Sequence, residues 1–148
     1  MLIRPATAAD KPEWLRLRHA LWDDADLDDL EQELEAHVKG EMPIIAFVLE
    51  RADGKLGGFL EASIRPWAEG CTAPNVGYVE GWYIDPDLRG GGHGRRLVEA
   101  AENWAIEQGC TEMGSDSYLD NLDGRAAHRA LGYEERSVNV HFRKLLKR

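Results

Sequence analysis

The stretch VGYVEGWYIDPDLRGGGHGRRLVEAAENWAIEQG, residues 76–109, decides the fold. Its first part, Val76–Ile84, is rich in β-branched and aromatic residues and predicts a strand, which Asp85 and Pro86 then end. After residue 94 the apolar residues repeat at helical spacing, and Gly109 offers a left-handed stop. A strand, a glycine-rich loop and a helix therefore follow one another, which is typical of an α/β protein.

The glycine-rich loop, residues 89–94, has the composition of an anion site. Its glycines let backbone N–H groups converge where a Cβ would obstruct them, and the start of a helix adds the positive end of the helix dipole. Arg89, Arg95 and Arg96 supply formal positive charge. The patterns GxxxxGK[ST] and GxGxxG are absent, which disfavours nucleoside triphosphates and dinucleotides. We expect a phosphate or pyrophosphate ligand here, and an ordinary turn before a helix is the alternative.

The rest of the chain divides into short strands and amphipathic helices with no repeat or linker. A capping-box pattern at Thr7–Asp10 precedes a helix through Trp14, Leu17 and Leu21. We therefore expect a single domain over residues 1–148. The other predicted elements are strands at Leu2–Arg4, Ile44–Arg51, Leu56–Arg65 and Thr111–Ser115, helices at Asp26–Lys39 and Leu122–Leu131, and two short strands between Tyr133 and Leu145.

Composition narrows the class of protein further. The 148 residues are 43% hydrophobic and 30% charged, which suits a folded globular domain and excludes a disordered or collagen-like chain. No apolar run approaches the ~20 residues that span a bilayer, and the start of the chain is too quickly polar for a signal peptide. We expect a cytoplasmic protein. The two cysteines and the histidines lack metal-ligand spacing, so we expect reduced structural cysteines and no metal site.

The net charge of −9 comes largely from one segment, residues 23–35, which holds eight acids and no Lys or Arg. Such a surface disfavours nucleic acid as a partner. Two interpretations stay open at this point: a solvated helix face that aids solubility, or a rim that attracts a cationic ligand.

The loop resembles the signature of the GNAT superfamily of acyl-CoA-dependent N-acyltransferases, Arg/Gln-x-x-Gly-x-Gly/Ala, because Arg89, Gly92 and Gly94 occupy its fixed positions. The resemblance implies an α/β (α+β) fold with a mixed, mostly antiparallel twisted sheet of six to seven strands flanked by about four helices. It also implies acetyl-CoA as cosubstrate. The coenzyme would be held by Trp82, Tyr83, Ile84, Arg89, Gly90, Gly91, Gly92, His93, Gly94 and Asn121. His128 stands where the family often has a tyrosine acid, and it is either that acid or a packed helix residue.

Acetyl transfer to an amine makes a specific demand on the site. A thioester is already activated, so an amine attacks it directly, but an alkyl amine with a pKa of ~10 is mostly protonated at neutral pH. Carboxylates near the thioester would hold that cation, and a backbone N–H near Trp82 would stabilise the tetrahedral intermediate. Glu80, in an apolar segment, and Asp116, at the end of the next strand, are the candidates. The alternatives are an exposed strand residue for Glu80 and a turn or cap for Asp116.

A closer resemblance covers nearly the whole chain. Segments such as residues 18–22, RHALW, and 114–117, GSDS, are similar to those of aminoglycoside 6'-N-acetyltransferases of the chromosomal, dimeric type. This likeness implies an antibiotic pocket lined by Trp22, Trp67, Glu80, Asp116 and Glu135, and a homodimer. Trp67 replaces a Tyr common in the relatives, and Glu135 is expected to compensate for Ser137, which replaces a Glu. Trp22 as a core aromatic is the alternative.

We therefore expect an acetyltransferase that acts on the 6'-amino group of an aminoglycoside, with Glu80 as a water-assisted base. Two other functions stay open. The first is an acetyltransferase for another polycationic amine, such as a polyamine, a metabolite or a peptide amine. The second is a CoA-binding module that no longer turns over.

Overall fold

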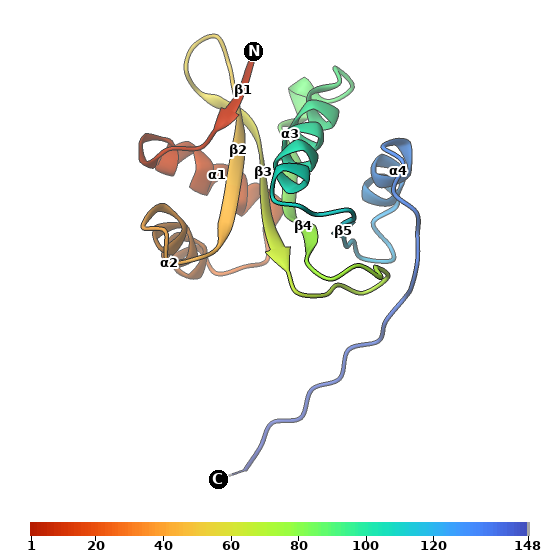
Figure 1. The fold of residues 1–148 in the computed structure, drawn as a ribbon. Coiled ribbons are helices and arrows are strands. Elements are labelled where there is room, and N and C mark those ends of the chain that lie inside the picture. Colours follow the sequence, from red (N-terminus) through yellow and green to blue (C-terminus); the bar gives the residue numbers. More distant parts are fainter. Residues whose placement is uncertain (148) are drawn as a thin grey trace. The chain divides into compact units, whose positions relative to one another are not determined.

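The computed structural model describes residues 1–147, which contain five strands and four α-helices (Figure 1). In chain order the elements are β1 (Leu2–Pro5), the 3₁₀ turn η1 (Ala8–Asp10), α1 (Lys11–Leu21), α2 (Leu27–Val38), β2 (Ile44–Glu50), β3 (Leu56–Arg65), β4 (Val76–Ile84), the 3₁₀ turn η2 (Pro86–Leu88), α3 (His93–Glu107), β5 (Met113–Ser115) and α4 (Leu122–Ala130). Contacts divide the chain after Asp116 into two compact units, and α4 lies in the second. The predicted α/β class and the four helices are confirmed.

The sheet is mixed and its strands follow the order β1-β2-β3-β4-β5. The first four strands pair antiparallel, and β4 pairs with β5 in parallel over Gly77–Val79 and Met113–Ser115. The tight turn between β2 and β3 is closed by a bond from Arg51 N to Lys55 O of 2.8 Å. Because the ladder with β5 ends at Val79, the second half of β4 has no strand beside it on that edge among the described residues.

Helices cover both faces of this sheet. Helices α1 and α2 lie on one side and α3 on the other, as Figure 1 shows. On the first side, Trp14 and Leu17 of α1 and Leu34 of α2 pack with Phe59 of β3 in one buried cluster. Burial of this apolar stripe is what stabilises helices with so many charged residues, since helix propensity alone contributes little.

A β-bulge interrupts the pairing of β3 with β4. Glu61 lies opposite Gly81 while Ala62 lies opposite Val79, so Glu80 has no partner across the ladder. A bulge of this kind places two successive residues on the same face of the sheet. Glu80 therefore faces the same side as Gly81 and comes close to Ser63, which pairs with Tyr78.

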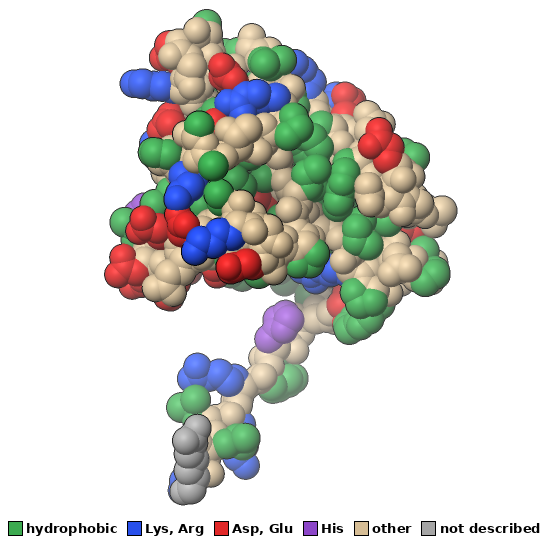
Figure 2. All heavy atoms as spheres, turned by 60° about the vertical axis from the view of Figure 1, so that its left-hand side comes forward, with side chains coloured by type: hydrophobic (Ala, Val, Ile, Leu, Met, Phe, Trp, Pro, Cys, Tyr) green, Lys and Arg blue, Asp and Glu red, His purple; other side chains and the backbone are tan. Residues whose placement is uncertain are grey.

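The end of the chain differs from expectation. We predicted two short strands between Tyr133 and Leu145, and a sheet of six to seven strands, and both predictions are wrong for the described residues. Residues 134–147 are extended but pair with no strand (Figure 1), and apolar side chains such as Val138, Val140 and Phe142 are exposed. Figure 2 shows hydrophobic side chains, in green, along this end of the chain. A strand needs a neighbour that bonds its N–H and C=O groups, and this segment has none there.

Among residues 1–147 no helix has both the length and the apolar character required to cross a bilayer.

Candidate active site

The loop between β4 and α3 has the backbone of an anion-binding turn. Gly90 and Gly92 have φ of 82° and 80°, a left-handed conformation that side-chain-bearing residues rarely adopt. Gly92 caps α3, whose first-turn N–H groups have no carbonyl partner within the helix. Those donors, the helix dipole and the nearby arginines fit a pyrophosphate, so the residues present suit the diphosphate of a coenzyme.

The end of β4 is held against this loop. A Cβ on Gly94 would lie 3.0 Å from the ring of Trp82, so glycine lets α3 begin close to the strand without displacing that ring. Arg89 turns back to β4: its Nε donates to the Ile84 carbonyl at 2.9 Å, and its guanidinium lies 5.4 Å from the centre of the Tyr83 ring. The structure thus brings the predicted coenzyme residues of β4 and of the loop together.

An ion-pair network fixes the turn that leads into the loop. Asp85 is buried and accepts bonds from Arg16 at 3.0 and 3.1 Å and from Arg51 at 3.1 Å. Arg51 also binds Asp87 in η2 at 2.8 Å, which keeps the pKa of that carboxyl below its ordinary value. The sequence analysis treated Asp85 only as a strand breaker, and its role as an anchor was missed.

Glu80 lies in a cluster of side chains from β3 and β4. Ser63 Oγ donates to its Oε1 at 2.6 Å, while Arg65 Nε and Nη2 donate to Oε1 at 2.9 Å and to Oε2 at 2.7 Å. The Glu80 side chain is 25% exposed, so the carboxylate is both held and open to solvent. These bonds raise the pKa of Arg65, whose charge is therefore permanent.

Asp116 belongs to the same cluster through Tyr78. The Tyr78 hydroxyl donates to Asp116 Oδ2 at 2.5 Å, and the Arg65 guanidinium lies 3.6 Å from the centre of the Tyr78 ring. Burial, with the bond to Asp116 second, raises the pKa of Tyr78. The phenol therefore stays a neutral donor, and the two predicted carboxylates are joined by Arg65 and Tyr78.

Trp22, at the end of α1, is half-buried and tightly placed. Arg18 lies 4.8 Å from the centre of its ring, and Phe59 meets it edge-on at 6.1 Å. A Cβ on Gly81 would lie 2.7 Å from two carbons of the Trp22 ring. Trp22 thus contacts the core, as the alternative interpretation expected, and it also contacts the backbone next to Glu80.

Beneath Trp22 lies a buried ion pair. Arg18 Nη1 binds Glu61 at 2.5 and 2.6 Å, and Trp14 Nε1 donates to the same carboxylate at 2.9 Å. Glu33, one of the acids of residues 23–35, binds Arg18 Nη2 at 2.5 Å. Part of the acidic segment is therefore structural.

Trp67 lies in the loop of residues 66–75 and is 66% exposed. The loop is closed by a bond from Asn75 N to Pro66 O of 3.2 Å. Glu112 anchors it from outside, because its Oε1 accepts bonds from Thr72 N at 2.9 Å, from Thr72 Oγ1 at 3.1 Å and from the backbone N of Ala73. An exposed tryptophan on an anchored loop is a side chain available to a ligand. Glu112 is a second residue that the sequence analysis missed.

Comparison with known proteins identifies the family to which the chain belongs. The Acetyltransferase (GNAT) family matches residues 9–133. The chain belongs to this family. Aminoglycoside N(6')-acetyltransferase type 1 of Klebsiella aerogenes is 40% identical to it over 147 residues, which cover 98% of this chain and 97% of that protein. The resemblance stated from the sequence is thereby confirmed.

Solved structures agree with this GNAT assignment over the full chain. The apo crystal structure of aminoglycoside antibiotic 6'-N-acetyltransferase AAC(6')-IG from Acinetobacter haemolyticus matches with a TM-score of 0.91 at 35% identity, covering 99% of this chain and 100% of that one. AAC(6')-Iy in complex with the bisubstrate analogue CoA-S-monomethyl-acetylneamine matches with a TM-score of 0.89 at 31% identity, covering 98% of each chain.

Three predicted residues of this GNAT chain lie in the second unit. Asn121 caps α4, since its side chain accepts a bond from Gly124 N at 3.0 Å. The ring of His128 contacts the Gly124 carbonyl at 2.6 Å and meets the Tyr133 ring edge-on at 5.8 Å, which are the contacts of a packed helix residue. Glu135 pairs with Arg125 and Arg129, and the bond to Arg125 lowers the pKa of its carboxyl to about 2.

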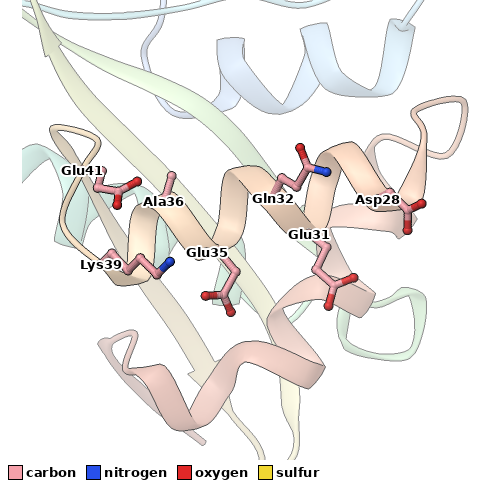
Figure 3. Close-up of a pocket in the computed structure, with 7 residues that line it drawn as sticks. All are labelled: Asp28, Glu31, Gln32, Glu35, Ala36, Lys39 and Glu41. Carbon is pink, nitrogen blue, oxygen red and sulfur yellow. The ribbon is translucent and has the colours of Figure 1, made fainter.

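The outer face of α2 in this GNAT domain carries a shallow acidic hollow. It is lined by Asp28, Glu31, Gln32, Glu35, Ala36, Lys39 and Glu41 (Figure 3). Figure 3 shows the carboxylates of Glu31 and Glu35 on the same side of the helix, and Glu35 pairs with Lys11. No member of the Glu80 cluster lines this hollow.

Proposed function

We propose that this chain transfers the acetyl group of acetyl-CoA to the 6'-amino group of an aminoglycoside antibiotic and thereby confers resistance. The observation that carries the proposal is the cluster in which Glu80 and Asp116 are joined through Arg65 and Tyr78. Full-length similarity to enzymes named for this reaction supports it.

The coenzyme would bind at the loop and along β4. The N–H groups of residues 90–94 and of the first turn of α3 would hold the diphosphate, with Arg89 beside them. The second half of β4 lacks a neighbour on its β5 side among the described residues, so its backbone is available to the pantetheine amides as an added strand.

The acceptor would bind as a polycation. Glu80 and Asp116 would accept charge-assisted hydrogen bonds from ammonium groups, and the tryptophan faces of Trp22 and Trp67 would add cation–π attraction of roughly 0.5 to 2 kcal/mol each.

The reaction is a direct transfer. The lone pair of the neutral 6'-nitrogen attacks the acetyl carbon and forms the C–N bond of a tetrahedral intermediate, whose carbonyl oxygen carries the negative charge. The intermediate then collapses: the C–S bond breaks, the CoA thiolate leaves, and the proton that the new amide nitrogen loses goes to the thiolate. A backbone N–H of β4 near Trp82 would stabilise the oxyanion. Because the amine binds as an ammonium ion, it must first lose a proton, which Glu80 would pass through water to solvent.

We also propose that residues 1–148 act as one domain in a cytoplasmic homodimer. Val138, Val140 and Phe142 are exposed and alternate with other residues, so in a strand they would form one apolar face. A second copy of the chain would bury that face. Light scattering during gel filtration tests this, and a monomer at micromolar concentration would refute it.

The decisive assay is thiol release from acetyl-CoA with a matched pair of acceptors. Neomycin and paromomycin differ only in a 6'-amine against a 6'-hydroxyl. We expect rapid release with neomycin and little with paromomycin, spermidine or a lysine peptide. Equal release with both antibiotics would refute acetylation at the 6' position. Release with spermidine or the peptide alone would identify another amine acetyltransferase, and none at all would indicate a silent CoA-binding module.

A further inference from the structure

Arg65 lies in the candidate active site, but the reaction outlined above gives it no role. Its guanidinium lies over the Tyr78 ring at 3.6 Å and binds both oxygens of Glu80. A cation is thus already present where the substrate ammonium is expected to bind. Its two contacts are a carboxylate and an aromatic face, which are the partners that a substrate cation would seek.

Glu80 nevertheless keeps room for one further donor. A carboxylate offers about four lone-pair sites, and three are taken, two on Oε1 by Ser63 and Arg65 and one on Oε2 by Arg65. A substrate amine can therefore bind Oε2 while Arg65 stays in place. The amine would then lie beside a permanent positive charge.

The other charged groups near this point are the same in the wild type and in any variant of Arg65, so they do not alter the difference that Arg65 makes. Asp116 keeps its negative charge and accepts a bond from the neutral Tyr78 hydroxyl. Farther along β3, Glu61 is neutralised by Arg18 of α1, whose second partner is Glu33 of α2. His37 of α2 lies 3.8 Å from Glu61, and burial lowers its pKa, which favours its neutral form. Arg65 is therefore the positive charge in direct contact with Glu80.

We propose that Arg65 is a positioning residue that orients Glu80 and, by its charge, favours the neutral form of the amine bound there. A like charge within a few ångströms disfavours the charged form of a titrating group. The enzyme would thus bind the acceptor through its remaining ammonium groups, while the one amine placed on Glu80 gives up its proton more readily. This inference rests on the proposed function.

The prediction concerns the pH dependence of kcat, because kcat reports groups that titrate in the enzyme–substrate complex. In Arg65→Met the acidic limb of kcat for neomycin should move to higher pH by about one unit, so that kcat on that limb falls about tenfold. In Arg65→Lys, which keeps the charge, the limb should stay within about 0.3 unit of the wild type. The KM for acetyl-CoA should not change in either variant.

Arg4→Met is the matched control, since Arg4 is an ion-paired arginine on β1 that binds Asp10 and Glu50 instead. The acidic limb of the pH dependence of kcat should not move in this variant. Two results would overturn the inference and leave Arg65 a purely structural residue. The first is an acidic limb of kcat that does not move in Arg65→Met, and the second is a limb that moves equally in Arg65→Met and Arg65→Lys. If Arg65→Met does not fold, Arg65→Gln carries the same prediction. Failure of the wild type to acetylate neomycin would refute the proposed function instead.

Discussion

Replacing Gly81 by alanine tests how the core positions Trp22 beside the candidate active site. The added Cβ would lie 2.7 Å from Cη2 and Cζ2 of Trp22 and 3.2 Å from Cδ2 of Leu21. Carbon atoms in contact prefer about 3.5–4.0 Å, so the indole must move by about 1 Å. It cannot do so freely, because Arg18 and Phe59 contact its ring.

Overpacking of this kind costs about 1–3 kcal/mol. For a chain of this size, a loss of about 2 kcal/mol lowers Tm by roughly 4–8 °C. Calorimetry at fixed protein concentration measures that shift. Because Trp22 would line the acceptor pocket, the KM for neomycin should rise severalfold in the same variant, while the KM for acetyl-CoA stays constant.

A double-mutant cycle supplies the control. If the clash with Trp22 is the cause, Trp22→Leu should relieve it, and the double variant should be more stable than the sum of the two single changes predicts by at least about 1 kcal/mol. Additive effects, or a Gly81→Ala variant within about 0.5 kcal/mol of the wild type, would refute the reasoning.

Three further predictions follow from other parts of the structure. Asp116→Asn should weaken aminoglycoside binding in calorimetry while CoA affinity stays nearly intact, and equal loss of both would make Asp116 a structural cap. Glu112→Ala should raise the KM for neomycin and leave that for acetyl-CoA unchanged, because it frees the loop that carries Trp67; an unchanged neomycin KM would contradict this. Burial lowers the pKa of His37, so below about pH 6.5 the unfolded chain binds a proton that the native one does not, and stability falls with pH. Urea unfolding at pH 7 and pH 5 should show a smaller loss in His37→Gln than in the wild type, and an equal loss would count against this assignment.

The sequence predicted most elements because their signals are local. The strand Val76–Ile84 has the predicted bounds, since an apolar run lies between a loop and the Asp85–Pro86 break. Glu80 stood out as a lone acid in that run, and Gly92 and Gly94 matched a loop signature. In each case the residues that carry the information are neighbours in the chain.

Other features depend on pairing that a local pattern does not contain. The position of Arg65 over Tyr78 follows from the register of β3 against β4, and Glu80 is left without a partner by the bulge in the same pair of strands. Glu112 contacts Thr72, which lies in a loop 40 residues earlier in the chain. Two short strands were predicted between Tyr133 and Leu145, but a strand also needs an adjacent strand, and a local sequence pattern does not supply one.

The most direct test of the account is to locate the acetyl group on the product. Neomycin is incubated with acetyl-CoA and the purified protein, and the product is analysed by mass spectrometry and two-dimensional NMR. We predict a single acetyl group on the 6'-nitrogen, and paromomycin unmodified at the 6' position under the same conditions. An acetyl group on any other nitrogen, or no acetylated product, would contradict it.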